Sequence, residues 1–459
     1  MNLYEMMKSH SSMNIHFPLG KVLSDYRQKL SNLPPGLRQA AFMFAATSLG
    51  SALNYLVHFA TSRMLGPAEY GIFASLNSFY MLISTPLGIL PMVTAHYIAQ
   101  FQARDEVYRA GPLLTAMLKW VALIGTIAGA VIALASPFLA IFFQISSTTP
   151  ILVVAALVFV GALMLVLTGA LQGLQKFLAL GINGIVGAIL RLAFAIGLVA
   201  LGLGASGALA APIFAGLVTF AIALVPLVPL LRRPPSTHRS DHGLTLKDVL
   251  AYAGLVLAGT TCFAALTNMD VMIVKHYFAP AEAGQYAAAS VLAKIILFFP
   301  GAIMAVLYPK AVERYARRQD SSGIARQAAA AVAGLCGGLA VVYFLIPSLL
   351  IRLLFGQGYE TAIPLVGLFG AAMALFALVS LQLTYYLSIH KTRYIPLMVG
   401  STLLQVTALV LFHNSLLEVI IILLVNAGTL LVVGEVICQG LTGAARRPST
   451  TEYKGLFSP

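Results

Sequence analysis

Runs of apolar residues recur along almost the whole chain, and no other feature restricts its fold as strongly. An α-helix needs about 20 such residues to cross a hydrocarbon core about 30 Å thick, and the runs have this length. Charged residues make up only 9% of the 459 residues, whereas soluble domains contain about 25%. The sequence therefore excludes a soluble globular protein and predicts an all-α polytopic membrane protein.

The apolar runs predict twelve transmembrane helices in two groups of six. The first group covers residues 40–62, 70–98, 113–138, 151–171, 177–201 and 208–231. The second covers residues 249–274, 284–308, 324–347, 361–387, 394–412 and 416–438. We divide the chain into an N-terminal segment (1–38), a six-helix bundle (39–231), a polar linker (232–248), a second six-helix bundle (249–438) and a tail (439–459). Apolar residues at helical spacing within 1–38 favour an interfacial helix on the membrane, with a frayed tail as the alternative.

The positive charges test this count, because cytoplasmic loops collect lysine and arginine. With twelve spans, 22 of the 28 lysines and arginines fall on the side of both termini, three fall on the other side and three lie inside spans. A miscounted span would destroy this asymmetry, so we expect both termini and the linker to be cytosolic. The net charge of +13 reflects this topology and attraction to anionic lipid head groups. It does not indicate a nucleic-acid partner.

The motif Pro-Ala-Glu-x-Gly occurs twice, at 67–71 and at 280–284, which are 213 positions apart. Residues around the motif agree at the same offset, as Leu53 does with Leu266. Six predicted spans separate the two copies, so the bundles form a parallel repeat, an arrangement that places the substrate path of transporters between two bundles. In each copy proline ends one helix, glutamate enters the first turn of the next and glycine lets the backbones approach. We interpret the motif as a structural connector.

The two copies also resemble a known family. The first contains LNYL (53–56) and RMLGPAEYG (63–71), and the second contains NMDV (268–271), AGQYAAAS (283–290) and LYPK (307–310). These stretches resemble the polysaccharide transporter family, the flippases of lipid-linked oligosaccharides, in the superfamily that also contains multidrug exporters. The resemblance covers residues 38–438. It implies that an undecaprenyl-diphosphate-linked sugar crosses the bacterial cytoplasmic (inner) membrane by ion-coupled alternating access, with polysaccharide polymerase or export machinery as partners.

Two basic residues are predicted near the membrane midplane, where a charge costs a few kcal/mol. Arg191 lies about 14 residues into its span and Lys294 about 10 residues into its own, at about 1.5 Å per residue. One comes from each bundle. We predict that both face a shared central cavity and bind the diphosphate or acidic sugars. The alternative is an ion pair or a carbonyl contact within one bundle.

Other polar residues in the spans are weaker candidates for substrate contact. Asn54, His58 and Arg63 form one helical stripe toward the outer end, where Arg63 would meet either a phosphate on exit or lipid head groups. Asn77 and Gln382 would contact sugar hydroxyls or, alternatively, link helices.

Two acids are candidates for ion coupling. Asp270 is the one acid well inside a span in the outer half, and it would bind a proton or sodium ion or else pair with Lys294. Glu435, near the cytosolic end of the last span, is a candidate for the same role. Prolines at Pro86 and Pro300 predict bends in two helices that are equivalent in the repeat.

Two other function classes stay open from the sequence. A small-molecule exporter of the same superfamily would favour acidic rather than basic cavity residues. A membrane-embedded sugar polymerase or ligase would need a large exterior loop with acids, bases or metal ligands, and the predicted exterior loops are short. Cys262, Cys336 and Cys438 lack the spacing of a metal site. We therefore predict a transporter rather than an enzyme, with no cofactor and no metal.

Overall fold

The structure is a computed structural model that describes residues 35–231, 246–317, 322–389 and 391–438. The predicted interfacial helix lies almost entirely outside the described residues, and so do most of the linker (232–245) and the tail (439–459). Every regular element within the described ranges is a helix, as the apolar runs predict.

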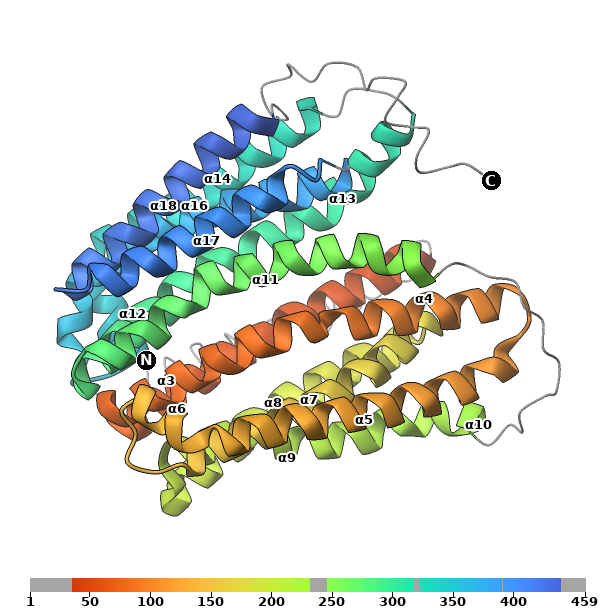
Figure 1. Cartoon of the computed structure of the whole chain (residues 1–459), viewed down its shortest axis with the longest axis horizontal. Helices are drawn as coiled ribbons and strands as arrows, with labels where there is room; N and C mark the ends of the chain where they lie inside the picture. Colours follow the sequence, from red (N-terminus) through yellow and green to blue (C-terminus); the bar gives the residue numbers. More distant parts are fainter. Residues whose placement is uncertain (1–34, 232–245, 318–321, 390, 439–459) are drawn as a thin grey trace, which may run out of the picture.

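The helices fall into two groups that follow the two halves of the sequence (Figure 1). The N-bundle consists of α3 (Pro35–Ser84), η1 (Thr85–Gly88), α4 (Ile89–Ala103), η2 (Val107–Arg109), α5 (Ala110–Leu134), α6 (Ser136–Phe142), α7 (Thr149–Gly173), α8 (Phe177–Leu198), η3 (Val199–Leu203), α9 (Gly204–Leu224), η4 (Val225–Leu227) and α10 (Val228–Leu231). The C-bundle consists of α11 (Leu246–Tyr277), α12 (Pro280–Lys294), η5 (Ile295–Phe298), α13 (Phe299–Ala316), α14 (Ser322–Leu345), α15 (Pro347–Leu354), η6 (Glu360–Ala362), α16 (Ile363–Ser388), α17 (Tyr394–Leu411) and α18 (Leu416–Cys438).

The described chain crosses the membrane twelve times, which confirms the predicted count. Ten continuous helical stretches are long and apolar enough to span a membrane. Two of them, 38–103 with 66 residues and 177–231 with 55 residues, each contain two crossings. The chain reverses inside these stretches at Gly66 (φ 70°) and Gly202 (φ 85°). Both values lie in the left-handed region that glycine adopts readily, so the reversals need these glycines.

Two predicted spans end earlier than the apolar pattern indicates. The spans predicted to reach residues 138 and 347 stop at Leu134 and Leu345, and the short helices α6 and α15 follow them. Pro137 and Pro347 stand in the first turns of these short helices. Proline fits the start of a helix but lacks the N–H that continues one, so hydropathy alone merged two helices here.

The two bundles meet along α3, which packs against α11 and α12. We call the end that carries the Gly66–Pro67 and Ala279–Pro280 turns the turn end, and the opposite end, where α11 begins, the linker end. The two motif turns touch each other: a Cβ on Gly284 would lie 1.8 Å from the carbonyl oxygen of Pro67. The predicted close approach at the motif glycines is therefore confirmed, and it joins the two bundles.

The α-helical pattern is interrupted at nearby, though not identical, repeat positions in the two halves. The 3₁₀ turn η1 contains Pro86, and the 3₁₀ turn η5 ends two residues before Pro300. Short 3₁₀ segments inside long helices often mark hinges. Pro86 thus lies inside such a segment, whereas Pro300 lies in the first turn of α13 directly after one, and the bends themselves stay a prediction.

Candidate functional site

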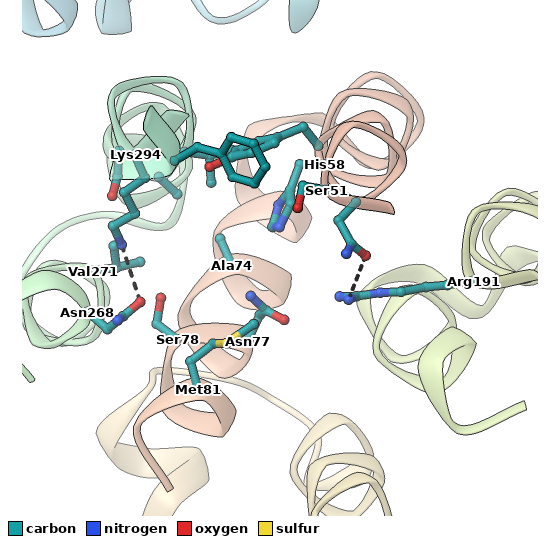
Figure 2. A pocket seen from close by; sticks show the side chains of 16 residues that line it. Ser51, His58, Ala74, Asn77, Ser78, Met81, Arg191, Asn268, Val271 and Lys294 are labelled. Carbon is teal, nitrogen blue, oxygen red and sulfur yellow. Dashed lines mark hydrogen bonds between the residues drawn. The ribbon is translucent and has the colours of Figure 1, made fainter. Parts of the chain in front are cut away.

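A cavity of about 310 Å³ lies between the two bundles. Helices α3 and α8 line it from the N-bundle, and α11, α12 and η5 line it from the C-bundle (Figure 2). Its lining consists of Ser51, Asn54, Tyr55, His58, Ala74, Asn77, Ser78, Met81, Arg191, Asn268, Val271, Ala287, Ser290, Val291, Lys294 and Phe298. Arginine and lysine are the charged residue types in this lining, so its potential is positive.

Most of the residues that line the cavity come from equivalent positions in the two copies of the sequence repeat. Six pairs of lining residues stand 213 positions apart, namely Tyr55 and Asn268, His58 and Val271, Ala74 and Ala287, Asn77 and Ser290, Ser78 and Val291, and Met81 and Lys294. Because paired residues occupy equivalent positions in the two copies, the cavity lies on the axis that relates the bundles. Its chemistry is asymmetric, since Lys294 in the C-bundle corresponds to Met81 in the N-bundle.

Lys294 is the last residue of α12, and its side chain lies on the C-bundle side of the cavity (Figure 2). Its Nζ donates a hydrogen bond of 3.4 Å to Oδ1 of Asn268 on α11. An ammonium group has three donors. Asn268 therefore orients the amine and leaves donors for a ligand. The structure places Lys294 in the predicted cavity, and its role in binding stays a prediction.

Arg191 projects from α8 on the opposite side of the cavity (Figure 2). Its Nη1 donates a hydrogen bond of 3.0 Å to Oδ1 of Asn54 on α3. Its buried Nε makes no hydrogen bond with any described residue. A guanidinium has five N–H donors, so Asn54 fixes its position and most donors remain for an anion. The predicted cations thus line one cavity from opposite bundles.

His58 connects the cavity lining with the turn end. Its Nδ1 lies 3.2 Å from the hydroxyl oxygen of Tyr70, and its ring lies 5.2 Å from that of Phe73. Tyr70 and Phe73 are buried on the part of α3 that follows the Gly66–Pro67 turn. A substrate group that contacts His58 in the cavity would therefore be linked through one hydrogen bond to Tyr70, which follows the turn.

Asp270 lies behind the lining and is fully buried. The Tyr286 hydroxyl donates a 2.9 Å hydrogen bond to its Oδ2, whereas its Oδ1 has no hydrogen-bond partner among the described residues. The two side chains form no direct salt bridge in this structure, since the amine contacts Asn268 and the carboxylate contacts Tyr286. Whether Asp270 binds an ion or acts as the counter-charge of Lys294 stays a prediction. In the described residues, no group of three or more His, Cys, Asp and Glu side chains is arranged to hold a metal.

Three other candidate residues lie outside the cavity lining. The buried Gln382 accepts a hydrogen bond from Tyr394 on α17 and donates one to a carbonyl oxygen of α18, so it links helices. Glu435 accepts a 2.7 Å hydrogen bond from the Tyr386 hydroxyl. Arg63 donates to the backbone carbonyl of Leu353 at the turn end. Of the predicted amides, Asn77 does line the cavity.

Sequence reasoning missed several polar residues of the lining. Asn268 and Ser290 were not selected, and Asn54 and His58 were noted only as members of a helical stripe. For Ser290 a signal was present in the repeat, because it is the equivalent of the candidate Asn77 at the 213-residue offset.

Comparisons with known proteins agree with this geometry. A sequence profile of the family described as polysaccharide biosynthesis protein matches residues 61–364, more than half of the chain. No curated protein sequence matches the chain.

Solved structures give the fold. An inward-facing multidrug resistance MATE family transporter of the MOP superfamily is 14% identical with a TM-score of 0.69, covering 86% of this chain and 96% of its own. The MATE multidrug transporter DinF-BH is 15% identical with a TM-score of 0.63, covering 88% and 95%. An outward-facing MATE family transporter is 16% identical with a TM-score of 0.61, covering 90% and 96%.

The family resemblance drawn from the sequence is therefore confirmed. The chain is a multi-pass membrane protein that belongs to the polysaccharide biosynthesis protein family and has the fold of the MATE transporters.

Proposed function

We propose that this chain is a flippase that moves a lipid-linked oligosaccharide across a bacterial cytoplasmic membrane. The observation that carries the proposal is the cavity on the repeat axis, to which each bundle contributes one cation, Arg191 or Lys294. A site shared by two repeats is the usual substrate position in transporters that work by alternating access. The family supports a role in polysaccharide biosynthesis, and the fold supports transport.

The lining suits an anionic, hydroxyl-rich cargo. The guanidinium of Arg191 and the ammonium of Lys294 would bind a diphosphate, the first by paired hydrogen bonds and the second as a point charge. Asn77, Ser78 and Ser290 offer amides and hydroxyls to sugars. Arg63 and Gln382 have no part in this site, because they lie outside the lining. A small-molecule exporter is the weaker proposal, since its cationic drugs would meet two positive charges.

The cavity size limits what enters it. Its volume of about 310 Å³ is at the small end of ligand pockets, which range from about 300 to 1,000 Å³. The diphosphate and the nearest sugar fit this volume, and a long polyprenyl chain does not. We therefore propose that the lipid tail stays among the lipid-facing helices while the charged head group crosses.

Ion coupling is proposed at Asp270. A buried carboxylate with one unpartnered oxygen is costly to keep charged, and a bound proton or sodium ion would neutralise it. The side chain is close to the cation site, because its neighbour on α11, Asn268, holds Lys294. Glu435, with its hydroxyl contact to Tyr386, is the second candidate.

The proposed orientation places the turn end outside the cell and the linker end, with both termini, in the cytosol. It rests on the excess of lysine and arginine at the linker end. In this orientation the cargo enters from the side on which sugars are attached to lipid. Machinery that polymerises or exports polysaccharide would receive it on the turn side.

The test is a substitution of Lys294 in cells whose surface polysaccharide depends on this protein. Lys294→Ala should abolish surface polymer, because losing a charged hydrogen-bond donor weakens binding by about 1.5–3 kcal/mol. Lys294→Arg should retain part of the activity, since the positive charge remains. The matched control is Lys119→Ala on α5, an exposed membrane lysine outside the cavity.

Membrane abundance is measured for each variant by immunoblot. Normal polymer from Lys294→Ala cells, or an equal loss from Lys119→Ala cells at normal abundance, would contradict the proposed site.

A further inference from the structure

The turn end is held by contacts that pass between the bundles in both directions. On one side, Arg63 at the end of the first crossing donates to the backbone carbonyl of Leu353 in the C-bundle. The hydroxyl of Tyr359, in the loop that follows α15, donates a 2.9 Å hydrogen bond to the carbonyl of Ser62. We call this pair of contacts the first clasp.

A second clasp has the same form with the bundles exchanged. The Nδ1 of His276, at the end of α11, lies 2.7 Å from the carbonyl oxygen of Phe142 in the N-bundle and therefore donates to it. The side-chain amide of Gln144 donates a 2.6 Å hydrogen bond to the carbonyl of His276. The rings of Phe142 and His276 stack at 4.5 Å with an interplanar angle of 10°.

The two clasps are equivalent in the repeat. Arg63 and His276 stand 213 positions apart, the same offset as the Pro-Ala-Glu-x-Gly motifs. Their acceptors, Leu353 and Phe142, lie near the ends of the short helices α15 and α6, which come after the third crossing of each bundle. The second contact of each clasp comes from the loop that follows the short helix. Each bundle thus uses the end of its first helix to hold a short helix of the other bundle and the loop that follows it.

The C-bundle loop that contributes Tyr359 to the first clasp is held in place by hydrogen bonds within the C-bundle. Gln285 on α12 donates a 2.6 Å hydrogen bond to the carbonyl of Gly358 and accepts one of 3.1 Å from the N–H of Ala362. This loop carries Phe355 and Tyr359, both buried, whose rings lie 6.1 Å from the ring of Tyr70 in the N-bundle. The loop is therefore fixed to one bundle and inserted into the other.

We infer that these two reciprocal clasps form the latch that keeps the turn end closed, and that both must break before the cavity can open on that side. Each clasp consists of hydrogen bonds between the bundles with aromatic ring contacts beside them, so separation of the bundles at the turn end removes all of these contacts together. The inference concerns the closed state of the protein itself and does not depend on which cargo the cavity binds.

The test measures how often the turn end opens in the full-length purified protein. Ser62 is fully buried beside the first clasp, so a Ser62→Cys thiol reacts with a soluble maleimide only from an open state. Cys336 is fully buried in the C-bundle core, and its reaction rate reports unfolding instead. Cys262 and Cys438 are replaced by alanine, and each reporter cysteine is studied without the other.

Tyr359→Phe removes one hydrogen bond and should raise the Ser62→Cys reaction rate about two- to tenfold. Arg63→Ala with His276→Ala affects both clasps and should raise it by more than Tyr359→Phe. The Cys336 rate should stay unchanged in these variants. The matched control is Arg352→Ala, an exposed residue of the first clasp's segment outside the described clasp contacts, and it should leave both rates unchanged.

An unchanged Ser62→Cys rate in both the single and the double variant would overturn the latch. An equal rise in the Arg352→Ala control would overturn it too. A parallel rise at Cys336 in every clasp variant, Tyr359→Phe included, would show that the contacts stabilise the fold as a whole rather than the closed turn end.

Discussion

The contact between the two motif turns makes a graded prediction at their glycines. Gly284→Ala places a Cβ 1.8 Å from the carbonyl oxygen of Pro67 and 2.4 Å from its carbonyl carbon. Both atoms belong to the backbone of the other bundle and cannot rotate away. The new methyl group therefore forces the bundles apart at the turn end.

The expected size of the effect follows from these distances. Inserting a methyl group into a close-packed contact costs about 1–3 kcal/mol, and the penalty falls on the closed state, because an open turn end removes the contact. The ratio of open to closed molecules should therefore rise about 5- to 150-fold. Gly71→Ala should have a smaller effect, since its Cβ would lie 3.0 Å from the nitrogen of Gly284. Gly301→Ala should have none, because no atom lies within 4 Å of its Cβ.

The assay is the reaction rate of the Ser62→Cys thiol in the three glycine variants, with Cys336 as the reporter of unfolding. The Ser62→Cys reaction rate should be highest in Gly284→Ala, intermediate in Gly71→Ala and lowest in Gly301→Ala, with constant Cys336 rates. Equal rates in Gly284→Ala and Gly301→Ala, with both proteins folded, would show that the contact between Gly284 and Pro67 does not hold the turn end closed.

Two further predictions concern the acids. Asp270→Asn should weaken transport and remove its dependence on pH or sodium, because an amide cannot exchange a proton or bind a cation by charge. The amount of surface polymer, measured at several pH values and sodium concentrations, checks this. An unchanged dependence would leave Asp270 only a structural role. Glu69→Ala should lower the free energy of unfolding by about 0.5–2 kcal/mol, because Glu69 Oε2 accepts a 3.0 Å hydrogen bond from the N–H of Ala205 in the first turn of α9. Thermal unfolding measures this, with Glu282→Ala for comparison, and no loss of stability would contradict the capping role.

Hydropathy and charge were sufficient to predict the number of transmembrane crossings and their division into two bundles. A span needs a fixed length of apolar chain, so the twelve crossings follow from the sequence, and the errors fall where proline starts a new helix within one apolar run, as at Pro137 and Pro347. The depth of Lys294 and Arg191 could be counted along their spans. Both line the cavity, because each bundle turns one polar surface toward the repeat axis.

The direction in which a side chain points was harder to predict. In a bundle that is apolar on every side, hydropathy does not show which face of a helix meets another helix, so Gln382 and Glu435 could not be distinguished from lining residues such as Asn77. The contact of Arg63 with the other bundle depends on α15, almost 300 residues away in the sequence, and no local pattern reports such a contact.

The binding of undecaprenyl diphosphate to the purified protein tests most directly whether the cavity between the bundles is the substrate site. If Arg191 and Lys294 bind the diphosphate from opposite bundles, Arg191→Gln and Lys294→Gln should each weaken binding by about 1.5–3 kcal/mol, or about 10- to 150-fold in Kd. Lys119→Gln should leave Kd unchanged. Equal Kd values for Lys294→Gln, Arg191→Gln and the unsubstituted protein would contradict the account.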